Sequence, residues 1–284
     1  MINLPQFDRL PEVKLQELLN HPAVQAGLAP FLAALASAGL FRPRLGGLAI
    51  IAGFIVMVYL ASDFTFAPLT AARKIVLLGL VSASLGLLLT LFKSRRLASL
   101  LPLLGGAAAI WTAQRILQQH PAHIVLLWGA GCAAYVAILV WAMDSLENDP
   151  ARAATAATAL GMGTGGSALV GASALLGQFG LALGSAASAY LLIHMFSNKA
   201  LHAGRIFTLP LSLIAGLTGC IAVLSANLPW YALPVLAAIP MAGLLMPLPG
   251  QSLRIRSLLL AVPAFALAGG AIYMTWRSAG DVPF

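Results

Sequence analysis

Long apolar segments separated by short, charge-bearing links decide what this chain can fold into. A helix needs roughly 20 mostly apolar residues to cross the hydrocarbon core of a membrane. Because a backbone inside lipid must satisfy its own hydrogen bonds, each such segment is expected to be helical. The sequence therefore predicts an all-α fold, a polytopic integral membrane helical bundle of about ten transmembrane helices. The segments are 23–41, 45–62, 75–92, 97–113, 124–143, 153–172, 175–196, 206–225, 231–248 and 257–276.

Composition excludes several other classes of protein. Of the 284 residues, 60% are hydrophobic and only 8% are charged, whereas a soluble domain carries about 25% charged residues. The net charge of +8 comes from basic residues that lie between the apolar segments, where such residues normally fix membrane orientation. We therefore expect the lipid bilayer as partner, and no nucleic acid.

The predicted organisation is a single transmembrane domain, 23–276, between two short ends. Residues 1–22 form an expected amphipathic N-terminal segment, and 277–284 form a short C-terminal tail. Within the first segment, leucines share one helical face while Lys14 and Glu17 occupy another. Such a helix lies on a membrane surface, docks a partner, or packs on the bundle as a lead-in.

Segment 23–41 is the weakest of the ten, because it is rich in alanine and holds Pro30 near its middle. With ten crossings the basic residues divide ten to six between the two sides; if 23–41 does not cross, they divide twelve to four. Charge bias thus favours nine crossings, and hydropathy favours ten. Both versions place the C-terminus on the non-cytoplasmic side of what we expect to be a bacterial inner membrane.

Glycines crowd the middle of segment 153–172. Each one weakens a helix by about 1 kcal/mol relative to alanine, and unwound helices at membrane depth form substrate and ion sites in many transporters. Small residues four apart also let two unbroken helices pack closely. The sequence leaves both alternatives open. The residues concerned are Gly161, Gly163, Gly165, Gly166 and Ser167.

Ionisable residues inside a bilayer are costly and mark candidate functional sites. Asp63 follows segment 45–62 and could carry a proton or cation there, and His194 is the histidine expected at membrane depth. Together with the glycine-rich residues, they are the candidates for a solute or ion pathway. On this hypothesis Gly165→Leu or Asp63→Asn abolishes uptake without lowering the amount of folded protein.

An acidic link between segments 124–143 and 153–172 holds Asp144, Glu147 and Asp149. It is interpreted either as a solvated helix end or as a surface that docks a partner. Lys14 and Glu17 are the further candidates for partner docking.

Motifs for catalysis or metal binding are missing from the sequence. Cys132 and Cys220 lie inside separate apolar segments, without a ligand at metal-binding spacing, and are expected to be buried small hydrophobic residues. There is no P-loop and no His-Glu-x-x-His motif. We therefore predict no catalytic residue, no metal and no cofactor, because an enzyme interpretation rests only on Ser167 and the histidines.

Two functions compete at this point. The favoured one is a permease or carrier for a small solute or ion. The alternative is a non-catalytic membrane anchor or assembly subunit, with other membrane subunits or a second copy of the chain as partners. Because few charged residues lie within the apolar segments, the sequence favours the permease over the assembly subunit only slightly.

Overall fold

The computed structural model describes residues 17, 19–41, 45–62, 64, 66–92, 95–196, 202–226, 228–247 and 253–280. Within these residues the chain forms helices and connecting links, with no strand, so the expected all-α bundle is confirmed. The elements are the π-helical turn η2 (Val24–Leu28), α2 (Ala29–Leu40), the 3-10 turn η3 (Gly46–Leu48), α3 (Ala49–Ala61), α4 (Ala71–Phe92), α5 (Arg95–Ala98), α6 (Leu101–Leu117), α7 (Ala122–Ser145), α8 (Pro150–Gly171), α9 (Ala174–Phe196), α10 (Arg205–Ser225), α11 (Ala232–Leu245) and α12 (Leu253–Ala279).

Each of the ten apolar segments coincides with a helical stretch of the structure. In the described part of the chain, five helices are long and apolar enough to cross a membrane, namely α4, α7, α9, α10 and α12. Shorter apolar helical stretches cover Val24–Leu40, Gly46–Ala61 and Ala232–Leu245. Length and composition thus indicate membrane insertion.

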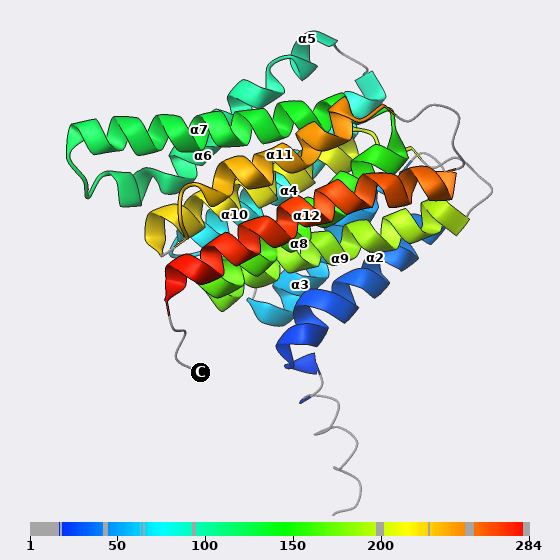
Figure 1. Cartoon of the computed structure of the whole chain (residues 1–284), viewed down its shortest axis with the longest axis horizontal. Coiled ribbons are helices and arrows are strands. Elements are labelled where there is room, and N and C mark those ends of the chain that lie inside the picture. Colours follow the sequence, from blue (N-terminus) through cyan, green and yellow to red (C-terminus); the bar gives the residue numbers. More distant parts are fainter. Residues whose placement is uncertain are drawn as a thin grey trace, which may run out of the picture.

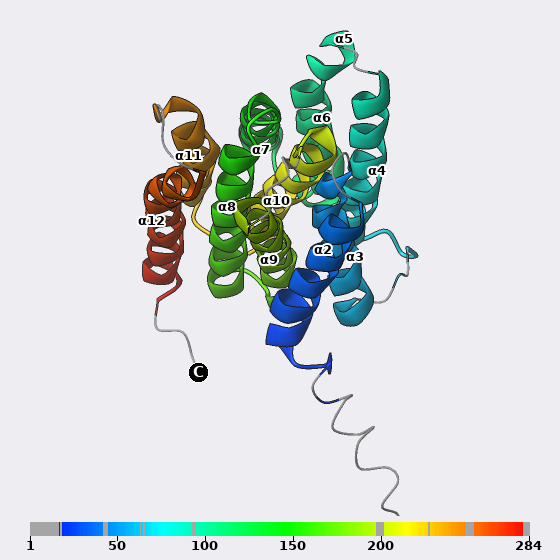
Figure 2. The same cartoon turned by 90° about the vertical axis from the view of Figure 1, so that its right-hand side faces the viewer.

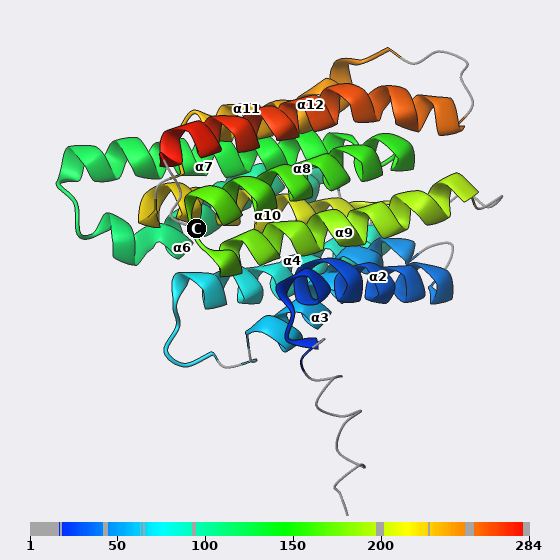
Figure 3. The same ribbon diagram turned by 60° about the horizontal axis from the view of Figure 1, so that its bottom comes forward.

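Helix α10 is the core of the bundle. Its side chains are buried without interruption from Ile206 to Ala222. Figure 2 shows α11 and α12 on one side of the molecule and α2, α3, α4 and α6 on the other, with α7 to α10 between them. In the lengthwise view of Figure 3, α11 and α12 again lie at the edge opposite α2 and α3. Most of the long helices run in roughly one direction (Figure 1). A helix buried on every side over this length lies at the centre of the bundle.

Pro30 explains the wide turn η2 that precedes α2. A proline inside a helix has no N–H group for the carbonyl four residues earlier, which here is Ala26. The Ser185 hydroxyl of α9 donates to that carbonyl over 3.3 Å. Segment 23–41 is thus tied into the bundle by a side chain that replaces the missing backbone donor.

The glycine-rich run is an unbroken part of α8. A Cβ atom built on Gly161 would lie 2.3 Å from the backbone nitrogen of Gly184 in α9, and one on Gly165 would lie 2.4 Å from that of Leu181. The two backbones therefore touch where side chains would otherwise stand. The alternative of an unwound break is wrong, because close packing against α9 stabilises the helical backbone.

A second pair of glycines brings α8 against α12. A Cβ on Gly163 would meet the Ala268 side chain at 3.0 Å, and one on Gly166 would meet the Ile272 side chain at 2.5 Å. Helix α8 is thus held between α9 and α12. The expectation that Gly165→Leu leaves the amount of folded protein unchanged is wrong, because Leu181 and Gly180 already occupy the space of its side chain.

We predict that Gly161→Ala destabilises the protein by about 1–3 kcal/mol, the usual cost of overpacking a tight interior. Gly269→Ala on α12 is the matched control, because its Cβ would meet nothing within 4 Å. Thermal unfolding in mild detergent measures both. Equal midpoints for the two variants would contradict the backbone contact between α8 and α9.

Candidate functional site

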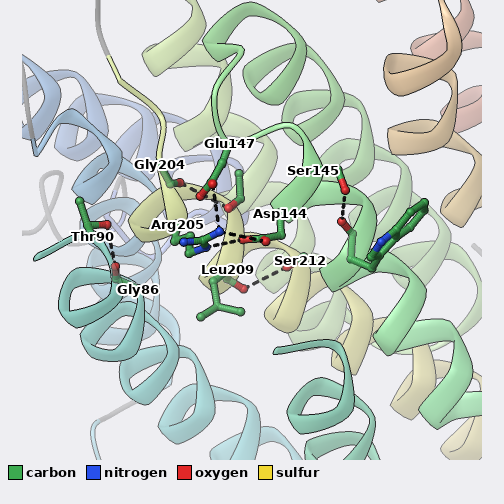
Figure 4. Close-up of polar contacts among 11 residues, drawn as sticks. Gly86, Thr90, Asp144, Ser145, Glu147, Gly204, Arg205, Leu209 and Ser212 are labelled. Atoms are coloured by element: carbon green, nitrogen blue, oxygen red, sulfur yellow. Dashed lines mark hydrogen bonds and ion pairs between the residues drawn. The ribbon is translucent and has the colours of Figure 1, made fainter. Parts of the chain in front are cut away.

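The link between α7 and α8 gathers arginines from other parts of the chain. Arg205, the first residue of α10, donates from Nε to Asp144 Oδ1 over 2.8 Å and from Nη2 to Glu147 Oε1 over 2.9 Å. The Gly204 N–H donates to the Glu147 carbonyl over 3.2 Å. Figure 4 shows the Arg205 guanidinium between the two carboxylates. These contacts fix the start of α10 to the end of α7.

Asp149 anchors the other half of this link. Its carboxylate accepts from the Arg152 backbone N–H at the start of α8 over 3.3 Å, which caps the helix. It also pairs with the Arg152 side chain at 3.2 Å and with Arg256 of α12. We name the six residues Asp144, Glu147, Asp149, Arg152, Arg205 and Arg256 the end cluster.

Arg152 extends the end cluster to α11. Its guanidinium donates to the carbonyls of Gly243, Leu244 and Met246 over 3.0, 3.1 and 2.9 Å. Carbonyls at the end of a helix have no partner within the helix. One arginine therefore caps α11 while it pairs with Asp149 at the start of α8.

The side chains of the end cluster are partly buried. Its side chains are 15–28% exposed. Burial raises the pKa of the Glu147 carboxyl above its usual value, and it outweighs the opposing effect of Arg205. All three acids of the link are engaged by arginines of the same chain. Their expected role in partner docking stays a prediction, as does that of the exposed Glu17.

His194 lies near the end cluster, in the last turn of α9. It is buried, and its Nδ1 atom has no hydrogen-bond partner. Its ring stacks on that of Tyr190 with a centroid separation of 6.5 Å. The Tyr190 hydroxyl is also buried without a partner, and its ring packs on Phe207 of α10 at 4.7 Å.

Further buried hydroxyls without partners lie in α8 and α10: Thr155, Thr164, Ser167 and Thr218. A hydroxyl in a helix usually bonds to a carbonyl of its preceding turn, as Thr158 does to Ala154 over 2.8 Å. Because the glycines of α8 face α9 and α12, helical geometry places Thr164 on the side nearer α10 and α11. Each unsatisfied group costs roughly 1–3 kcal/mol.

The structure brings only part of the predicted pathway together. Asp63 and Lys14 lie outside the described residues. The four glycines serve helix contacts, whereas Ser167 and His194 are buried groups with unpartnered polar atoms.

Sequence reasoning missed the arginines of the end cluster and the hydroxyl of Thr164. The arginines stood out only as orientation signals between apolar segments, and nothing in the sequence distinguishes Thr164 from Thr158.

In the described part of the chain, no three His, Cys, Asp or Glu side chains are grouped to hold a metal ion. No protein-family model and no curated protein matches this sequence. The function is therefore inferred from the residues themselves.

We predict that Arg205→Gln lowers stability by roughly 2–3 kcal/mol, somewhat less than the cost of breaking a fully buried ion pair. The loss arises because Asp144 and Glu147 stay in place without their cation. Arg115→Gln, at an exposed arginine of α6, should change stability by less than about 0.5 kcal/mol. Chemical unfolding in detergent measures both, and equal effects would show that the ion pairs of Arg205 contribute nothing.

The stability of the protein should depend on pH through the raised pKa of the partly buried Glu147 carboxyl. Because its folded pKa lies above the usual 4.5, the folded protein binds this proton more tightly than the unfolded chain does. The contribution of protonated Glu147 to stability is therefore lost as the pH rises from 4.5 through the folded pKa. Glu147→Gln should gain stability relative to the wild type over that rise, measured as a difference in Tm. A difference that shrinks with rising pH would contradict the dominance of burial.

Proposed function

We propose that this protein is a membrane permease or carrier for a small solute or ion, and that the end cluster closes one end of its pathway in this conformation. The observation that carries the proposal is the set of buried, unpartnered hydroxyls of Thr164, Ser167 and Thr218. Buried polar groups are almost always paired in proteins. Water or a polar solute between α8 and α10 would supply the missing partners.

The end cluster supports a closed state that can open. Its ion pairs join α7 to α10 and α8 to α12, across elements distant in sequence. Opening would hydrate both partners of each pair, so it would cost less than Arg205→Gln, which leaves two carboxylates without their cation. Carriers of this type work by rocking one group of helices against another, and breaking the pairs of Arg205 and Arg256 would free such a movement.

His194 is the proposed coupling residue. This histidine is buried, and its Nδ1 atom has no hydrogen-bond partner, so a proton taken up there would change the charge at the end of α9. The carrier would then couple solute movement to protonation on the side of the end cluster.

The test is flux into liposomes that contain the purified protein. A trapped pH dye reports proton movement, and a radiolabelled panel of amino acids, sugars, Na⁺ and K⁺ reports solute movement. We predict flux above that of empty liposomes, and its loss in Thr164→Val. Stability should not fall in this variant, because valine removes an unsatisfied hydroxyl of similar shape.

Thr158→Val is the matched control on the same helix, since its hydroxyl is bonded within α8; flux should persist. Wild-type flux equal to that of empty liposomes for every probe would contradict the permease. Co-purification with a stoichiometric second polypeptide, together with absent flux, would favour the assembly subunit instead.

A further inference from the structure

An apolar groove of about 760 Å³ lies between α7 and α11. Its walls come from residues 127–138 of α7 and 230–241 of α11 and the link before it. These helices lie beside each other (Figure 1). The end cluster lies beyond this stretch, at the other end of α7. Leu127 and Trp230, which are 72% and 61% exposed, mark the opening of the groove at the surface of the bundle.

The chemistry of the groove excludes a polar or charged occupant. No charged side chain lines it. The Tyr135 hydroxyl is buried against α10, where a Cβ on Gly219 would lie 3.2 Å from it. Tyr135 therefore lines the groove with its ring and not with its hydroxyl. Hydrocarbon is the matching occupant, because an apolar surface left without packed neighbours loses dispersion contacts.

The length of the groove distinguishes a lipid chain from a helix. Residues 127–138 of α7 rise about 17 Å at 1.5 Å per residue, roughly half of a 30 Å hydrocarbon core. Trp128 and Trp230 line the groove, both near the helix ends away from the end cluster, and tryptophan favours the headgroup level of a bilayer. The groove thus extends from the headgroups to the bilayer centre. A helix of a partner would need the full thickness.

We propose that the groove binds one acyl chain of a phospholipid from the leaflet at the α6–α7 turn, with the headgroup beside Trp128 and Trp230. The site is independent of the permease function and requires only that the bundle is inserted in a membrane. The bound chain would fill the space between α7 and α11 and hold their separation constant.

The test uses the full chain in vesicles of phosphatidylethanolamine and phosphatidylglycerol, doped with phosphatidylcholine that carries a photoreactive diazirine on one acyl chain. After irradiation, the cross-linked peptides are identified by mass spectrometry. We expect them to concentrate in 127–138 and 230–241, and a diazirine near the chain end to react furthest from Trp128.

Gly131→Phe should fill the groove, because Gly131 lines it and its Cβ would meet nothing within 4 Å. Cross-linking there should fall to the level of the surrounding lipid, because the ring takes the space that the bound chain would fill. Gly269→Phe places the same ring on an exposed glycine of α12 and should leave cross-linking unchanged. Ala238→Phe repeats the test from the opposite wall, should Gly131→Phe fail to fold.

Three results would overturn the proposal. Cross-links spread evenly over all lipid-facing helices would show ordinary surrounding lipid. Undiminished cross-linking in both groove variants would place the bound chain elsewhere. A cross-linked second polypeptide in the groove, whether another protein or another copy of this chain, would show that a protein occupies it.

Discussion

The backbone contact between α8 and α9 is the constraint on which the rest of the bundle depends. Lipid tails are as apolar as the side chains they surround, so helices in a membrane associate through close packing. Gly161 and Gly165 bring the α8 backbone onto α9, while Gly163 and Gly166 admit α12 on another face. With three helices held this closely, α10 can bury its whole circumference beside them. In this sequence with few charges, close backbone packing therefore holds the interior helices in place.

The two ends of the molecule differ in chemistry. At one end, Arg152, Arg205 and Arg256 join five helices through carboxylates and helix-terminal carbonyls. Toward the other end, an apolar groove lies between α7 and α11. Between them, hydroxyls such as Thr164 and Thr218 stay buried without partners. The proposed carrier function rests on this combination of an ion-paired end and buried, unpartnered hydroxyls.

The helices could be predicted from the sequence because a single backbone segment in lipid satisfies its hydrogen bonds only as a helix. The length of each apolar segment was therefore enough to predict the ten helical stretches. The state of the glycine run could not be predicted. Glycine weakens a helix and also permits close packing. The run stays helical because Gly180 and Gly184 of α9 let the two backbones touch, and this contact is known only from the fold. The partners of the arginines depend on the fold as well: Arg205 meets Asp144 across 61 residues of chain. The same holds for Ser167, whose hydroxyl lacks a partner only in the folded bundle.

The most direct test of the central claim is the water accessibility of the interior hydroxyl positions. Thr164→Cys and Thr218→Cys, each in a chain with Cys132 and Cys220 replaced by alanine, would be treated in sealed proteoliposomes with a membrane-impermeant thiol reagent. The account predicts modification at both positions and none at Leu169→Cys, a 51% exposed position of α8 that the proposed insertion would place against lipid. Complete protection of all three cysteines would contradict a polar pathway between α8 and α10.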